Sequence, residues 1–155
     1  MYAVSSCVYF QLLADLQKLF PVNTQEIADQ YKKALRRMNN AKEILSAKAG
    51  KEGKYYHYED VKYVKKACRV AYKAVLIAIN AYLEMKGKTV NGKPDLVNLN
   101  DYRRALNDDT EMFNDYNNAR STLYCAGGNG NLNSLTIASG MESGDAIINA
   151  IRPAD

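Results

Sequence analysis

The stretch VKYVKKACRVAYKAVLIAINAYLEM, residues 61–85, decides the fold. Apolar side chains recur in it at alternating steps of three and four, the spacing of one face of an α-helix. These positions are Val61, Val64, Cys68, Ala71, Val75, Ala78 and Tyr82. The first half carries basic residues on its other faces, whereas the second half is apolar on nearly every side. Because a helix that is apolar all round must be covered all round, we expect it to run from a solvated end into the protein centre.

Amphipathic stripes of the same spacing lie on either side of this helix, which we expect over 58–87. Asn23 and Glu26 form a capping arrangement at the start of a helix over 24–49, and Gly50 is suited to end it. A third stripe runs over 99–123 and a fourth over 132–151. The sequence therefore predicts an all-α fold, an antiparallel up-and-down four-helix bundle in one domain over residues 23–152.

Residues 1–22 predict an additional short amphipathic helix. One side of it carries Val8, Leu12, Leu16 and Leu19. The segment has no basic residue before Lys18, and Asp15 interrupts its apolar character. It therefore fits neither a signal peptide nor a membrane span of about 20 apolar residues, and we expect no membrane association. We expect this helix to cap the bundle or to bind a partner.

Three cysteines, Cys7, Cys68 and Cys125, are odd in number and far apart in the 155-residue chain. No CxxC pair and no Cys/His cluster is present. This pattern supports neither a disulfide framework nor a zinc site, and it is typical of reduced thiols in a cytoplasmic protein. We expect no metal and no cofactor.

Residues suited to catalysis are scarce. His57 is the single histidine, and no cysteine lies near it in sequence. Asp108 and Asp109 are interpreted as acids on a solvated helix face. The run AGGNGN at 126–131 lacks the Lys-Ser or Lys-Thr ending of a phosphate-binding loop, and we interpret it as a turn between helices. No residue is assigned a catalytic role.

Positive charge is concentrated in the first two bundle helices. The chain has a formal net charge of +4, and residues 32–73 hold 13 basic residues against four acidic ones. Such a surface is suited to phosphate groups. Alternatively, the acidic third helix neutralises it, within the molecule or across a dimer. The candidate phosphate or nucleic-acid ligands are Lys32, Arg36, Lys62, Lys65, Lys66 and Arg69.

Aromatic residues precede the central helix in the stretch KYYHYEDVKYVKK, residues 54–66. Exposed together, they would form an edge that binds a protein partner or a nucleobase. The candidates for this edge are Tyr55, Tyr56, His57 and Tyr58. The alternative interpretation is a solvated helix start, with Glu59 and Asp60 in the first turn.

Four segments resemble successive helices of HEPN-like helical-bundle proteins: YKKALRRMNNAKEIL, RVAYKAVLIAINAYLEMKG, FNDYNNARSTLYCAGG and SGMESGDAIINAI. The resemblance implies an up-and-down bundle, often a homodimer, that works beside nucleotidyltransferase domains, as a toxin–antitoxin component or as an RNA-cleaving effector. It also implies that an arginine followed a few residues later by a histidine carries catalysis. Arg120 matches that arginine, but no histidine follows it in this chain.

The leading hypothesis is therefore a non-enzymatic, homodimeric, cytoplasmic bundle protein that binds a protein partner, a nucleotide or a nucleic acid. One alternative is a divergent RNA-binding or RNA-processing protein that uses the basic helices. A second alternative is a structural subunit of an assembly, with no ligand.

Overall fold

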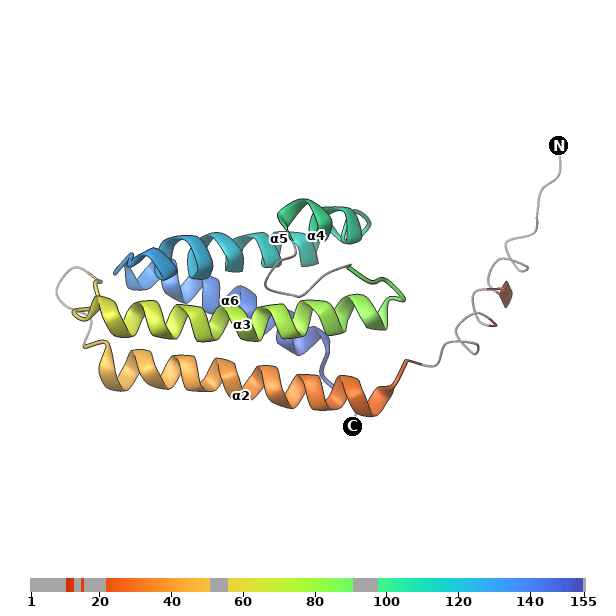
Figure 1. Cartoon of the computed structure of the whole chain (residues 1–155), viewed down its shortest axis with the longest axis horizontal. Helices are drawn as coiled ribbons and strands as arrows, with labels where there is room; N and C mark the ends of the chain where they lie inside the picture. Colours follow the sequence, from red (N-terminus) through yellow and green to blue (C-terminus); the bar gives the residue numbers. More distant parts are fainter. Residues whose placement is uncertain (1–10, 13–14, 16–21, 51–55, 91–97, 155) are drawn as a thin grey trace.

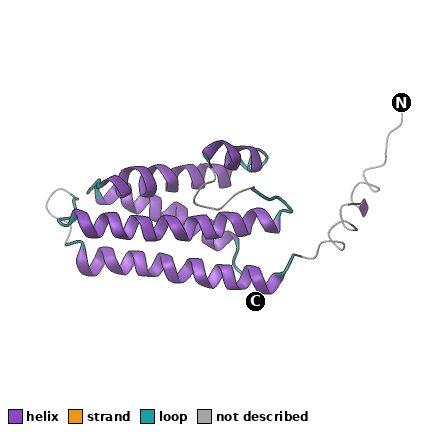
Figure 2. Cartoon of the chain, in the orientation of Figure 1, coloured by secondary structure: helices purple, strands orange, loops and turns teal. Residues whose placement is uncertain are grey.

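The computed structural model describes residues 11–12, 15, 22–50, 56–90 and 98–154, and these residues are helical with connecting loops (Figures 1 and 2). The elements are α2 (Thr24–Lys48), α3 (Val61–Met85), α4 (Leu99–Ala105), α5 (Thr110–Ala119), the π-helix η2 (Arg120–Ala126), the 3-10 turn η3 (Gly127–Asn129) and α6 (Ser134–Ala150). Within these ranges there is no β-strand, only an isolated bridge between His57 and Asn133. The predicted all-α class is confirmed.

The central element is α3, which contacts α2, α5, α6, η2 and η3. Figure 1 shows it between α2 and the run formed by α5 and η2, with α6 behind. Every position of the predicted stripe is buried except Val61, which is 44% exposed in the first helical turn. The second half of α3 is covered on most sides, as its all-round apolar character predicts.

Helix α2 begins and ends as its sequence indicates. The Asn23 side chain accepts a hydrogen bond from the Glu26 amide at 3.2 Å, which satisfies one of the free amides of the first turn. At the other end Gly50 has a φ of +88°, a conformation that glycine adopts without strain. The Ala49 carbonyl then accepts hydrogen bonds from the amides of Glu59 and Asp60, both at 3.0 Å. These bonds hold the start of α3 beside the end of α2.

The start of α3 differs from the expected helix over 58–87. Asp60 is the N-cap, and its side chain accepts a hydrogen bond from the Lys62 amide at 2.9 Å. Tyr58 lies before the helix, and its amide donates to the Leu132 carbonyl at 2.9 Å. The helix therefore begins at Val61 because the chain before it pairs with the segment that precedes α6.

The third helix is not continuous, which corrects the helix expected over 99–123. Helix α4 ends at Ala105 and α5 begins at Thr110. Asp109 caps α5, because its side chain accepts a hydrogen bond from the Met112 amide at 3.1 Å. The apolar stripe survives the break, since Leu106 is still buried.

Helix α5 continues as η2 and η3, where the backbone lies close to α3. A Cβ atom on Gly127 would collide with Sγ of Cys68, so this approach requires glycine. The predicted turn at 126–131 is therefore partly a packing contact, with Gly127 and Gly128 both buried. Burial also raises the pKa of the Cys68 thiol to about 11, which keeps it protonated and unreactive.

The helix expected over residues 1–22 falls almost wholly outside the described residues, and its packing stays a prediction. None of the described helices has the length and apolar character needed to cross a membrane.

Candidate functional site

The solvent side of α3 forms a groove lined almost entirely by cations. The hollow has a volume of about 560 Å³. Two valines, Val61 and Val70, are its only uncharged lining residues. We call it the α3 basic groove, and its cations are Arg37, Lys62, Lys65, Lys66, Arg69 and Lys73.

Helical spacing explains why these cations share a face. Lys62, Lys66, Arg69 and Lys73 follow one another at steps of four, three and four, on the side of α3 away from its buried stripe. Arg37 joins them from α2, because α2 packs along α3.

The other edge of the groove lies against the chain that follows η3. A Cβ atom on Gly130 would lie 2.9 Å from both Cε of Lys65 and Cγ2 of Val61. The α3 basic groove therefore extends from Arg37 of α2 across the surface of α3 to Val61 and Lys65, which pack beside Gly130.

The cations of the α3 basic groove have no ion-pair partner within the described part of the chain. No carboxylate lines the groove, and none of its six cations forms an ion pair with a described acid. Two acids of the third segment have other partners: Asp101 pairs with Arg104, and Asp108 with Lys88. Direct ion pairing of the groove cations with the third segment of the same molecule therefore does not occur among the described residues. A cleft lined by one sign of charge attracts the opposite sign.

The six predicted phosphate ligands divide into two groups. Lys62, Lys65, Lys66 and Arg69 lie in the α3 basic groove, whereas Lys32 and Arg36 line a separate hollow of about 790 Å³ along α2. Arg37 lines both hollows and Glu43 also borders the second. The charged residues that line the α3 basic groove are therefore all cations, whereas the hollow along α2 also has an acidic lining residue.

Two groove residues, Arg37 and Lys73, were not among the predicted ligands. Lys73 continues the spacing of Lys66 and Arg69, so the helical pattern of the sequence could have found it. Arg37 could not be found in this way, because its place depends on how α2 and α3 align.

The predicted aromatic edge is divided in the structure. Tyr55 lies outside the described residues, Tyr56 is 57% exposed, and His57 is exposed beside Asn133. Tyr58 is half-buried and packs against the core. The Ser134 amide donates to the Tyr56 carbonyl at 2.8 Å, so backbone pairing, not a shared aromatic surface, organises this segment.

A second aromatic group, which the sequence reading did not single out, lies on η2. Tyr124 is 55% exposed, and its ring centroid lies 5.0 Å from that of Tyr72 on α3. The Arg120 guanidinium lies 5.8 Å from the Tyr124 ring centroid. Beneath them, the hydroxyls of Tyr72 and Tyr116 are 3.3 Å apart. Burial is the main cause that raises the pKa of both phenols, so both stay protonated.

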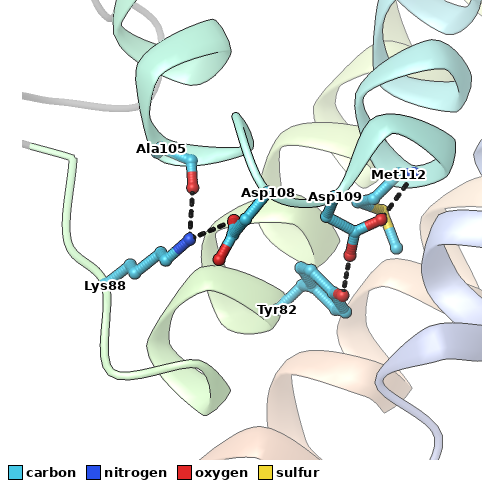
Figure 3. Close-up of polar contacts among 6 residues, drawn as sticks. All are labelled: Tyr82, Lys88, Ala105, Asp108, Asp109 and Met112. Atoms are coloured by element: carbon cyan, nitrogen blue, oxygen red, sulfur yellow. Dashed lines mark hydrogen bonds and ion pairs between the residues drawn. The ribbon is translucent and has the colours of Figure 1, made fainter.

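A polar cluster at the other end of α3 holds the turn between α4 and α5 (Figure 3). The Tyr82 hydroxyl donates to the Asp109 carboxylate. Lys88 donates to the Asp108 carboxylate and, at 2.9 Å, to the Ala105 carbonyl. The pair Asp108–Asp109, interpreted from sequence as a solvated face, thus ties this turn to α3.

The protonation states of this cluster suit a structural role. The hydrogen bond from Tyr82, followed by that from the Met112 amide, lowers the pKa of Asp109. Burial and then the bond to Asp109 raise the pKa of Tyr82 to about 12. A protonated phenol donating to an ionised carboxylate leaves no activated nucleophile or base. The described residues also contain no group of three or more His, Cys, Asp or Glu side chains able to hold a metal ion.

A protein-family model matches residues 29–153, a range that includes the α3 basic groove and η2. The matching family is described as a domain of unknown function, DUF5618. The chain belongs to the DUF5618 family. A search of curated proteins gives no match.

A solved structure resembles this DUF5618 chain closely. It is a protein of unknown function from Dyadobacter fermentans, 29% identical in sequence, with a TM-score of 0.67. The match covers 79% of this chain and 94% of that one. Neither description refers to HEPN-like proteins.

Proposed function

We propose that this DUF5618 protein is a non-enzymatic nucleic-acid-binding protein that holds phosphates in the α3 basic groove. The observation that carries the proposal is the set of six cations with no carboxylate among the described residues around them. Like charges held together oppose the compact state, so an external anion is the natural partner of such a groove.

The dimensions of the groove suit a polymer of phosphates better than a single ion. Lys62 and Lys73 are 11 residues apart on one helix, which corresponds to about 16 Å along its axis. Cations spaced along this length can contact successive phosphates of one strand. Binding through six phosphate contacts predicts that log K falls with log salt with a slope of about −4 for a single strand.

The test is fluorescence anisotropy with a labelled RNA over a range of salt concentrations. The triple variant Lys62→Gln, Lys66→Gln and Arg69→Gln is expected to weaken binding and make the salt slope shallower by about 2. A matched control removes three charges outside the groove, with Lys86→Gln, Arg103→Gln and Arg152→Gln, and is expected to bind as the wild type does. Equal loss in both variants, or no RNA binding by the wild type at low salt, contradicts the proposal. Binding of an acidic protein in place of RNA would reassign the groove to a protein partner.

The absence of catalysis is proposed on two grounds. Arg120, the residue that matches the HEPN-like arginine, has no histidine after it in the chain. Its described contacts are the Tyr124 ring and the Cys125 sulfur at 4.0 Å, and neither is the histidine that the HEPN-like arrangement uses.

The finer assignments from sequence complete the proposal. They are a HEPN-like, antiparallel up-and-down four-helix bundle over residues 23–152, a separate N-terminal helix over 1–22, a homodimer, a cytoplasmic location, and work beside a nucleotidyltransferase or a toxin–antitoxin partner. The break between α4 and α5 is compatible with a bundle, because Tyr102 and Tyr116 are buried on either side of it. Sedimentation at tens of micromolar tests the dimer, and a single species of 17.3 kDa would contradict it.

A further inference from the structure

We propose that the nucleic acid in the α3 basic groove is single-stranded and that its unpaired bases stack on Tyr124 of η2. This inference rests on the proposed function, and it names the class of nucleic acid and the residue that recognises it. Three observations carry it: the position of α3 between flanking elements, the contact of Tyr124 with Tyr72 of α3, and the support that holds the Tyr124 ring.

The shape of the groove excludes the usual way in which a helix reads a duplex. A major groove is about 12 Å wide and admits one protruding α-helix. Here α3 is flanked by α2 on one side and by the η2–η3 run on the other, so it does not protrude from the molecule (Figure 1). A single strand can lie along the hollow on α3, with phosphates towards the cations, whereas a duplex would meet the flanking elements first.

Tyr124 is linked to the groove through its contact with α3. Its ring packs at a tilt against Tyr72, and Tyr72 follows Arg69 of the groove by three residues on the same helix. Residues three apart are neighbours on a helix surface. A base that stacks on Tyr124 therefore lies next to a strand whose phosphates contact Arg69.

The Tyr124 ring is held in place before any ligand binds. Tyr72 supports it with a centroid distance of 5.0 Å and an angle of 37° between the rings, and the Arg120 guanidinium lies 5.8 Å from its centroid. Yet 55% of the residue remains exposed. A large exposed aromatic that is already ordered costs little entropy on binding, which is the arrangement that base stacking uses.

The experiment compares Tyr124→Leu and Tyr124→Phe in the full chain, with circular dichroism melting to establish that both are folded. The probes are an unstructured RNA of about 16 nucleotides, a duplex of equal length, and inorganic polyphosphate. Tyr124→Leu is expected to raise the Kd for the single strand about tenfold, whereas Tyr124→Phe restores binding. Polyphosphate has no bases, so neither change is expected to alter its Kd. Tyr56→Leu is the matched control, because Tyr56 is about as exposed as Tyr124 but has no described ring contact with α3.

The outcomes separate this inference from the proposed function. Tighter binding of the duplex, or an unchanged Kd for the single strand in Tyr124→Leu, overturns the inference and leaves phosphate binding in the groove. An effect of Tyr56→Leu as large as that of Tyr124→Leu moves the stacking surface to the segment before α3 and also overturns it. No binding of any probe by the wild type overturns both.

Discussion

The charged side chains at the two ends of α3 differ in whether they have partners within the fold. Near the start of α3, six cations line the α3 basic groove without a described ion-pair partner. At its other end, Tyr82 in the last turn donates to Asp109, and Lys88 just beyond the helix pairs with Asp108 (Figure 3). Charges that have partners within the fold can stabilise it, whereas unpaired like charges oppose it. The far cluster therefore contributes contacts that maintain the fold, and the groove is the site that we propose for an external ligand.

The largest effect on stability is expected from Asp109→Ala. This change removes the cap of α5 and the partner of the Tyr82 hydroxyl, and we expect it to lower the free energy of unfolding by about 2 kcal/mol. Urea denaturation measures the loss. Glu142→Ala removes an exposed acid that makes no described contact, and it is expected to leave stability unchanged. Equal effects of the two changes would deny Asp109 a structural role.

A pair of lysine substitutions tests the comparison directly. Lys88→Met removes a bond to Asp108 and another to the Ala105 carbonyl, so a loss of about 1 kcal/mol is expected. Lys66→Met removes a groove cation with no described partner, and a change within about 0.5 kcal/mol in either direction is expected. Thermal denaturation of both variants measures and compares the two changes in stability. If Lys66→Met destabilised the protein more than Lys88→Met, the groove would be the structural element.

The smallest effect is expected in the pH dependence of stability. The pKa of Asp109 is lowered in the folded state, so its contribution is present above its ordinary pKa of 3.8 and is lost as pH falls through the folded pKa. The pKa of Tyr82 is raised from 10.0 to about 12, so its contribution is present below pH 10 and is lost as pH rises towards 12.

Melting temperatures measured across the pH range check both effects. In the acid limb of this curve the melting temperature falls as pH is lowered, and in the alkaline limb it falls as pH is raised. Asp109→Asn is expected to flatten the acid limb, and Tyr82→Phe is expected to flatten the alkaline limb. Lys66→Met is expected to preserve the wild-type shape of both. An acid limb that is the same in Asp109→Asn and in the wild type would show that this carboxylate is not linked to folding.

Prediction from sequence succeeded where the pattern was local. The stripe of α3 is buried from Val64 to Tyr82, and the Asn23 cap of α2 forms as predicted. The prediction of one continuous third helix was wrong. Apolar residues keep the same spacing on either side of Leu106 whether or not the helix breaks there, so the pattern does not reveal the break. Asp108 and Asp109 are polar in either case, and only their contacts with Lys88 and Tyr82 reveal their role.

The candidate site was only partly predictable, for a related reason. Lys62, Lys65, Lys66 and Arg69 could be grouped because they share one helix. By contrast, Arg37 and Tyr124 reach the face of α3 from other elements. The aromatic residues next to the basic stretch in sequence, Tyr56 and Tyr58, instead join backbone pairing with the chain before α6.

The sequence by itself determined that this protein is helical, which faces of its helices are buried, and that positive charge gathers on α2 and α3. These properties follow from the 3.6-residue period of a helix, which couples only near neighbours along the chain. The tertiary structure alone decided which cations share one groove, which tyrosine stands beside it, and where the third helix breaks. Each of these depends on contacts such as Tyr72 with Tyr124 or Tyr82 with Asp109, whose partners meet only when separate helices pack together.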